Sequence, residues 1–472
     1  MRSLMLVVAA VFIGLAGAGC VEKACTIDGE CRAKFGEGWT CDQGEYVCVG
    51  PSDGADAGTD AGRDDDDAGT GDAGVDAGTT TCAMTCPSGQ RCVDGACACD
   101  AVSCPNGCCR EGVCGPLSEC GTCGNCTWSP GPEMQLARAF PSAVQLDHSS
   151  ILVAGGMLAP SKRIADVTAR AEVLDLALGT SAEVSPMNEP RAHHLLVNLG
   201  GTILACGGYR KNTDGDFQAL QSCERFEPTT RAWSDAAPML FARSGAAFTV
   251  MVDGYRLFVA GGTSDQGSTA TAEIFDVRTG RWDQVASMGH ARTLATAIRL
   301  SGGRIAVVGG ADASAGMEIY DPVADQWTSS GPMISNRYRG AAARGSAGIV
   351  FSGGAQSVDT PFTTAISSSE VLDGLNQWRL LGDMSSPRMD HTLVRLRNQR
   401  MLAIGGHDSA RPVRHVHAST EMLEFSGVWE LRSTLTLGRS HHATEVLPDG
   451  RVVVLGGAGD EFTATASTDI LH

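Results

Sequence analysis

Short apolar runs, each closed by a pair of glycines, recur along the C-terminal part of the chain. The last of them reads Arg-Val-Val-Val-Leu-Gly-Gly at 451–457. An apolar run of this length, bounded by turn residues, is typical of a buried β-strand. The glycine pairs follow one another at intervals of about 50 residues and begin at Gly155, Gly207, Gly261, Gly309, Gly353, Gly405 and Gly456.

Three further strand-like segments accompany each run. A preceding segment such as 246–252 is joined to it by turn residues such as Asp253-Gly254, which favour a hairpin. An acidic residue opens the third segment, as in Ala-Glu-Ile-Phe-Asp at 272–276, and in most repeats a Trp lies in the fourth. Four antiparallel strands repeated at this period are typical of a propeller blade, and the pattern occurs seven times.

The double Gly, the Glu-aromatic-Asp strand and the Trp together resemble the kelch repeat, over residues 128–472. The resemblance implies an all-β fold, with a seven-bladed kelch-type β-propeller over residues 127–472 like the central propeller of galactose oxidase. Trp128 stands six residues before Met134 with no earlier blade to join, so residues 126–130 are expected to supply the outer strand of the seventh blade. Ser181 replaces the Trp of the first blade, where we expect weaker packing.

Every repeat also carries one arginine shortly before its first strand and one acid at the start of its third. The arginines are Arg138, Arg191, Arg243, Arg292, Arg337, Arg388 and Arg439. The acids are Glu172, Glu224, Glu273, Glu318, Glu370, Glu421 and Asp469. Two interpretations are open: Arg–carboxylate contacts that stitch neighbouring blades, or a basic funnel for an acidic ligand. We favour stitching, because all seven repeats share the pair whereas binding sites are usually asymmetric.

The 19 cysteines fall into groups that predict disulfides. Four lie within a small Cys-rich segment, 20–50, after Cys20, and twelve lie within a second Cys-rich module, 82–126. Even numbers in an exported chain indicate a disulfide framework whose connectivity the sequence leaves open. The last two, Cys206 and Cys223, occupy positions held by small residues in other repeats, as expected of opposed neighbours on adjacent strands. We predict that they form a disulfide within blade two.

The N-terminus has the features of a targeting segment. Arg2 precedes an apolar run at 4–15, too short to span a bilayer comfortably, and small residues lead to Cys20. This resembles a bacterial lipoprotein signal, which implies that residues 1–19 are removed, that Cys20 is lipidated and that the protein is anchored to the membrane of the cell envelope. The alternative is ordinary signal cleavage after Ala18 and free secretion.

An acidic segment, 51–81, separates the two Cys-rich segments. It contains nine Asp against one base, Arg63, and is otherwise mostly Gly, Ala, Thr and Ser. Such a composition predicts a disordered linker, although its run of four Asp leaves calcium binding as an alternative. The net charge of −18 argues against nucleic acid as a partner.

The expected function is non-covalent binding of a protein or glycan, without a cofactor and without a catalytic residue that the sequence singles out. The long loops between second and third strands, 157–170, 209–222, 355–368 and 407–419, would carry specificity. Several histidines cluster in the second, sixth and seventh repeats, and we interpret them as packed or channel-lining rather than as a metal centre. They are His193, His194, His391, His407, His415, His417, His441 and His442. The alternative function is an extracellular sugar-active enzyme related to kelch-fold oxidases or epimerases.

Overall fold

The computed structural model describes most of the chain from residue 127 and six short strands before it. The described ranges are 127–158, 166–212, 215–310, 316–335, 337–346, 348–355, 364–373, 377–408 and 415–472. The six strands form three hairpins: β1 (Thr40–Asp42) with β2 (Val47–Val49), β3 (Arg91–Val93) with β4 (Ala96–Ala98), and β5 (Cys108–Arg110) with β6 (Val113–Gly115).

The predictions for the signal at 1–19, for Cys20 and for the linker at 51–81 lie outside the described residues, as do most of the two Cys-rich segments. By contacts the chain divides into two units, Met1–Ala68 and Gly69–His472. Within the described ranges, no helix has the length and apolar character that a membrane crossing requires.

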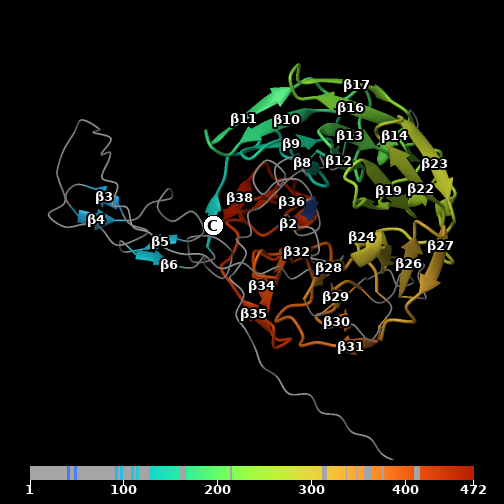
Figure 1. The fold of residues 1–472 in the computed structure, drawn as a ribbon. Helices are drawn as coiled ribbons and strands as arrows, with labels where there is room; N and C mark the ends of the chain where they lie inside the picture. The colour runs from blue at the N-terminus through green and yellow to red at the C-terminus, as the bar shows by residue number, and fades with distance from the viewer. Residues whose placement is uncertain are drawn as a thin grey trace, which may run out of the picture. The chain divides into compact units, whose positions relative to one another are not determined.

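From Trp128 onward the chain forms seven four-stranded antiparallel sheets arranged as a ring, which confirms the predicted seven-bladed propeller (Figure 1). Blades 1 and 2 are β8 (Ser142–Gln145), β9 (Ser150–Ala154), β10 (Ala171–Asp175), β11 (Thr180–Val184); and β12 (Leu195–Leu199), β13 (Thr202–Cys206), β16 (Cys223–Glu227), β17 (Ala232–Ala236). Blades 3 and 4 are β18 (Ala247–Val250), β19 (Arg256–Ala260), β22 (Ala272–Asp276), β23 (Arg281–Val285); and β24 (Thr296–Arg299), β25 (Ile305–Val308), β26 (Met317–Asp321), β27 (Gln326–Ser329).

Blades 5 and 6 are β28 (Ala341–Gly345), β29 (Gly348–Ser352), β30 (Ser369–Leu372), β31 (Trp378–Leu380); and β32 (Thr392–Arg395), β33 (Met401–Ile404), β34 (Thr420–Leu423), β35 (Trp429–Leu431). Blade 7 is β36 (Ala443–Val446), β37 (Val452–Leu455), β38 (Thr468–Leu471) and β7 (Trp128–Pro130). Two small hairpins lie between the second and third strands of blades 2 and 3. They are β14 (Tyr209–Lys211) with β15 (Phe217–Ala219), and β20 (Thr263–Ser264) with β21 (Gly267–Ser268). Two short 3₁₀ turns occur at Ser301–Gly303 (η1) and Asp460–Phe462 (η2).

The ring closes where the isolated Trp128 indicated that it would. Strand β7 pairs antiparallel with β38, so that Trp128 opposes Leu471 and Pro130 opposes Asp469. The first and last segments of the propeller therefore share one sheet, which leaves blade 7 with four strands like the others and removes an exposed strand edge.

The hydrophobic core is divided among the seven interfaces between adjacent blades. The second strands are apolar and almost fully buried, because both of their faces pack against a neighbouring blade. The interface of blades 2 and 3, for example, joins Leu204 and Leu195 to Val259 and Phe275, and the other six interfaces have equivalent clusters. Tryptophans of the fourth strands also contact the neighbouring blade. For example, Trp282 of blade 3 donates its indole N–H to the carbonyl of Ala237, just after blade 2, at 3.0 Å.

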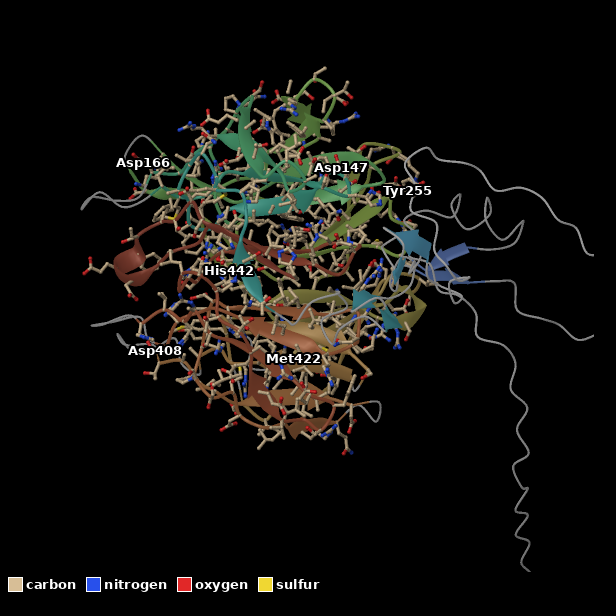
Figure 2. The ribbon with its side chains drawn as sticks, turned by 90° about the vertical axis from the view of Figure 1, so that its left-hand side faces the viewer. Asp147, Asp166, Tyr255, Asp408, Met422 and His442 are labelled. Atoms are coloured by element: carbon tan, nitrogen blue, oxygen red, sulfur yellow. A yellow bond between two sulfur atoms is a disulfide. The ribbon has the colours of Figure 1, made fainter. Side chains whose placement is uncertain are left out.

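The two faces of the propeller carry different connections. The side view places Asp166 and Asp408, from second-to-third-strand loops, on one face and Tyr255, from a first-to-second-strand turn, on the other (Figure 2). The first face is here called the loop face. The glycine pairs lie at the loop-face ends of the second strands, and both residues of each pair have positive φ. At Gly155 a side chain would also meet the carbonyl oxygen of Arg191, so the close approach requires glycine.

Candidate functional site

The seven arginines of the repeat hold the blades and face no ligand. Each is at most 3% exposed, and its Nη1 donates to the carbonyl of the first glycine of the pair at 2.6–3.3 Å. Its Nη2 lies 2.5–2.8 Å from the carboxylate of the third strand. The pairs are Arg138–Glu172, Arg191–Glu224, Arg243–Glu273, Arg292–Glu318, Arg337–Glu370, Arg388–Glu421 and Arg439–Asp469.

Main-chain atoms of the same arginines contact the preceding blade. The carbonyl of Arg138 accepts from Gly457 of blade 7, and that of Arg191 accepts from Gly156 of blade 1, both at 2.9 Å. Six of the seven arginines accept such a main-chain bond from the preceding blade, while their side chains bond within their own blade. Burial lowers the pKa of Arg243 and the carboxylate of Glu273 opposes that shift, as in an ion pair withdrawn from water. The predicted Arg–carboxylate contacts therefore lie within single blades, and the link to the preceding blade is made by the main chain of the arginine.

A second repeated position, two residues after each arginine, surrounds the propeller axis on the loop face. All seven residues there have positive φ, between 50° and 58°. Successive members are joined by main-chain hydrogen bonds, for example from Asp390 N to Arg339 O at 2.8 Å and from Phe140 N to His441 O at 2.9 Å, the latter linking blade 1 to blade 7. We call these residues the axial ring; they are Phe140, His193, Gly245, Leu294, Arg339, Asp390 and His441.

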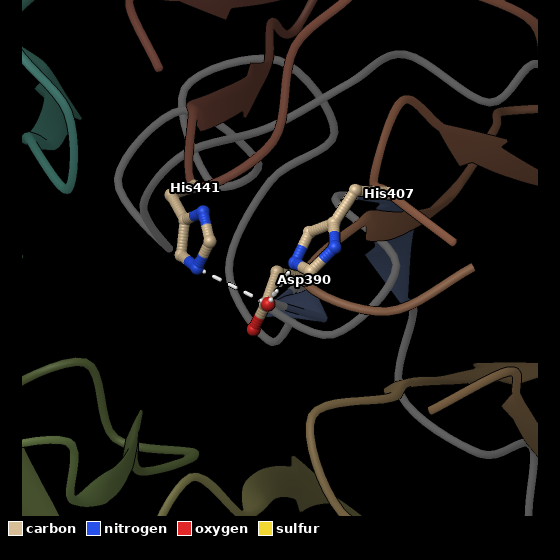
Figure 3. A group of neighbouring side chains, drawn as sticks. All are labelled: Asp390, His407 and His441. Carbon is tan, nitrogen blue, oxygen red and sulfur yellow. Dashed lines mark hydrogen bonds and ion pairs between the residues drawn. The ribbon is translucent and has the colours of Figure 1, made fainter. Parts of the chain in front are cut away.

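The axial ring is chemically asymmetric, because its charged members all come from blades 5 to 7. Asp390 lies between the imidazoles of His407 and His441, whose Nε2 atoms are 2.9 and 3.1 Å from its Oδ2 (Figure 3). Arg339 completes the group: its Nε lies 3.0 Å from Asp390 Oδ1, and its Nη2 contacts Oδ2. One carboxylate therefore lies against four side-chain nitrogen atoms at the axis.

The electrostatics of this cluster follow from its burial and its partners. Burial alone raises the pKa of Asp390, but the charge and hydrogen bonds of His441, His407 and Arg339 outweigh it and hold the pKa well below its usual value. His193 lies further round the ring, where burial, with a smaller contribution from His441, lowers its pKa to about 4. At neutral pH the cluster therefore contains an ionised carboxylate, and His193 is uncharged.

A row of aromatic rings leads from the charged cluster towards the edge of the loop face. His441, Phe140, His193, Tyr209 and Phe217 contact one another in that order, with successive ring centroids 4.1–5.6 Å apart. The row ends in solvent, since Phe217 is 57% exposed. Aromatic faces beside polar groups can stack on a ligand while the polar groups orient it.

Asp390, His407 and His441 have donor atoms within 4.8 Å of one another, a set that could ligate a metal ion. The guanidinium of Arg339, however, already lies against all three, with Nη2 3.4 Å from each imidazole Nε2. It supplies the positive charge that the carboxylate requires. The side chains of Arg339 and Asp390 are 20% and 12% exposed, so this ion pair is what the cluster presents to a ligand.

The structure assigns separate places to the other residues that the sequence singled out. Cys206 and Cys223 form a disulfide across β13 and β16. Both cysteines of residues 127–472 are therefore joined in one bond. His194, His391 and His442, three residues after their arginines, are buried, as expected for packed histidines.

Sequence reasoning missed Arg339 and Asp390, and it treated His193 and His441 only as members of a histidine cluster. The signal was available: once the seven arginines are aligned, the residue two places later can be read off. It was overlooked because that position, unlike the arginine, has a different side chain in most repeats.

Comparison with known proteins agrees with this architecture. The kelch motif family matches residues 190–240 and 244–289. The chain carries kelch motifs. Its similar proteins include human Kelch-like protein 23, 26% identical over 213 residues, which are 44% of this chain and 36% of that protein. They also include mouse Kelch-like protein 35, 30% identical over 159 residues, which are 34% and 26% of the two chains.

This chain spans about a third of the length of the curated relatives that it matches. Among solved structures it is similar to a fungal alcohol oxidase of the AA5 family in complex with copper, with a TM-score of 0.58 and 15% identity. The superposition covers 74% of this chain and 76% of the oxidase. At that identity the likeness shows the propeller fold alone.

Proposed function

We propose that this kelch propeller binds a protein partner non-covalently at the axial mouth of its loop face. Kelch propellers commonly bind proteins, which favours a protein over other ligands. The first residues of the long loops of blades 2 and 6, Tyr209 and His407, belong to the aromatic row and the charged cluster at this mouth. The partner would therefore contact both loops and the axial ring.

The observation that carries this proposal is the identity of the side chains in the axial ring. A left-handed backbone costs a non-glycine residue about 1 kcal/mol, and glycine avoids that cost. Six of the seven ring positions nevertheless hold a side chain, and only Gly245 is glycine. Strained residues gather where a side chain is needed for function, and here the side chains are concentrated around one opening.

The chemistry of the mouth indicates the kind of segment that would fit. The Arg339–Asp390 pair offers guanidinium N–H donors and carboxylate acceptors that are fixed in position by His407 and His441. The aromatic row offers flat apolar surface beside them. A polypeptide loop with one polar side chain and a neighbouring aromatic or aliphatic residue would complement both parts.

The test compares two Arg–Asp pairs of the same propeller. Random peptides displayed on phage are selected against the full chain, and dissociation constants of the recovered peptides are measured for wild type, Arg339→Gln and Asp390→Asn. We expect each variant to weaken binding at least tenfold, about 1.4 kcal/mol, as for a central interface residue. The matched control is Arg278→Gln, which breaks the exposed Arg278–Asp276 pair in the turn between β22 and β23 and should leave binding unchanged.

Two results would overturn the proposal. Peptides that bind both axial variants as tightly as wild type, while both variants remain folded, would place the binding surface elsewhere. Ligands recovered only from a glycan array, with no peptide selected, would assign a glycan to the mouth. An oxidase assay on common sugars with added copper tests the enzymatic alternative, and turnover there would favour it.

We also propose that the protein is held in a bacterial cell envelope through a lipid on Cys20. The support is the sequence alone: a short apolar run followed by small residues and this cysteine. Mass spectrometry of the N-terminal peptide should find a diacylglyceryl group on Cys20, and Cys20→Ser should release the protein from membranes. An unmodified Cys20, or a mature chain that begins at Gly19, would instead support secretion.

A further inference from the structure

A second cluster of histidines and an acid lies in the blade-6 loop, apart from the axial cluster. This loop leaves β33 at His407 and returns to β34 through residues 415–417. His407 forms an antiparallel bridge with Val416. The flanking hydrogen bonds, Asp408 N to His415 O at 3.2 Å and His417 N to Gly406 O at 2.8 Å, extend the same register.

The register determines which side chains share a face of this loop. Neighbouring residues on a strand point to opposite faces, and cross-strand partners point to the same face. Asp408 opposes His415, so Asp408, His415 and His417 share one face. His407 points the other way, towards the axis, where it contacts Asp390. A His-x-His pair and a cross-strand carboxylate therefore face each other on the loop.

The donor atoms of these three residues lie within 4.8 Å of one another. The Nε2 of His417 is 3.0 Å from the carbonyl of Pro387. That hydrogen bond would fix the ring proton on Nε2 and leave the Nδ1 lone pair available, the arrangement in which imidazoles commonly bind metals.

The surroundings of the cluster differ from those of the axial cluster. Among the described residues, no basic side chain forms an ion pair with Asp408, whereas Arg339 neutralises Asp390. Burial is graded: His417 is 8% exposed, Asp408 is half-buried and His415 is exposed. Such a site has two anchored ligands, one ligand that can swing inwards, and an open side for water.

We propose that Asp408, His415 and His417 bind a divalent transition-metal ion of the Zn²⁺ class at the edge of the axial mouth. Two imidazoles and one carboxylate suit Zn²⁺, Ni²⁺ or Cu²⁺ and disfavour Ca²⁺ and Mg²⁺, which prefer oxygen ligands. At metal–ligand distances of about 2.1 Å, cis ligands are about 3–3.5 Å apart, so a small inward movement of His415 completes the site. The bound ion would tie the two arms of the blade-6 loop together beside His407.

The experiment uses the full chain without a histidine tag, stripped with a chelator and then titrated with Zn²⁺ in competition with a chromogenic chelator. We expect Asp408→Asn and His415→Gln each to weaken this binding at least tenfold. Since His415 is exposed, its substitution should leave folding intact. Co²⁺ should give visible ligand-field bands in wild type that both variants lose. The control His290→Gln removes another exposed histidine, 44% exposed, and should leave both readouts unchanged.

Two further variants make the outcome decisive. If Asp390→Asn abolishes Zn²⁺ binding while the double variant Asp408→Asn/His415→Gln retains it, the metal belongs to the axial cluster and the proposal is wrong. It is equally wrong if the double variant binds Zn²⁺ as tightly as wild type, because the ion is then held elsewhere in the chain. Neither measurement of Zn²⁺ binding requires the protein partner, so the metal-site proposal and the protein-binding proposal can fail separately.

Discussion

The repeated Arg–acid pair makes a quantitative prediction about what holds the blades together. We consider Arg243→Met in blade 3. The guanidinium of Arg243 lies 2.8 Å from Glu273 and donates to the carbonyls of Gly261 and Thr271 at 2.6 and 3.0 Å. Both charged side chains are 0% exposed. Methionine keeps most of the side-chain volume but removes the charge and every one of these donors.

The expected cost follows from what the substitution leaves behind. Glu273 would remain buried without a counter-charge, and removal of one partner from a buried pair typically costs about 3–5 kcal/mol. For a propeller of roughly 350 residues this corresponds to a fall in melting temperature of about 4–7 °C. The exposed pair in the same blade provides the comparison: Arg278→Met changes a side chain that is 55% exposed, so we expect a much smaller loss of stability.

The direction in which the stability loss changes with pH provides an independent test of this prediction. Burial raises the pKa of Glu273, and Arg243 and main-chain N–H groups oppose the rise. Without Arg243 the native carboxyl binds its proton more tightly than the unfolded chain does, so stability falls as pH rises through the ordinary carboxyl range. The deficit of Arg243→Met relative to wild type should therefore be smallest at acidic pH and largest at neutral pH.

Thermal and urea unfolding of wild type, Arg243→Met, Glu273→Gln and the double variant Arg243→Met/Glu273→Leu measure these effects. The double variant removes both charges and should be more stable than Arg243→Met alone, although the carbonyl of Gly261 loses the Arg243 donor and that of Thr271 keeps only the N–H of Gly261. A loss below 1 kcal/mol for Arg243→Met, or a deficit that grows on acidification, would contradict the stitching role.

Three further predictions concern other parts of the propeller. Replacing Cys206 and Cys223 together by Ala should lower the free energy of unfolding by about 3 kcal/mol, because their disulfide closes a loop with a sequence separation of 17; the difference should vanish when wild type is unfolded under reducing conditions. His193, whose pKa burial lowers to about 4, should show no imidazole titration by NMR between about pH 5 and 8, and a midpoint in that range would contradict its burial. Asp390 has a depressed pKa, so its stabilisation is complete above the ordinary carboxyl pKa and lost as pH falls below it; the stability difference between wild type and Asp390→Asn, from urea unfolding at several pH values, should shrink in acid.

The fold could be predicted because its signals are repeated. Seven copies of the glycine pair allow each blade to be aligned with the others, and the extra Trp128 then indicates where the ring closes. Cys206 and Cys223 could be paired in the same way, since their counterparts in other blades showed which positions oppose each other. Comparison of the chain with itself replaces much of what related sequences would supply.

The candidate site could not be predicted by this route, because it consists of what the repeats do not share. Asp390 and Arg339 meet only when blades 5 and 6 are placed round a common axis, and 51 residues separate them in the chain. His407 joins them from outside the axial ring, at its bridge to Val416. Periodicity identifies the strands. Which side chains meet at the axis depends instead on the left-handed backbone of the residue two places after each arginine.

The stitching pairs and the axial ring are two consequences of one local design. Buried ion pairs and glycine contacts hold the backbone on either side of each axial-ring residue. The surrounding structure therefore imposes the positive φ of that residue. Gly245 and Leu294 share the positive φ of Asp390, at 57°, 56° and 50°, although their side chains have nothing in common. The fold therefore sets the backbone of the ring and leaves its side chains free to vary. A propeller built this way can change the chemistry of its mouth one blade at a time, which is why the asymmetry of this position points to what the protein binds.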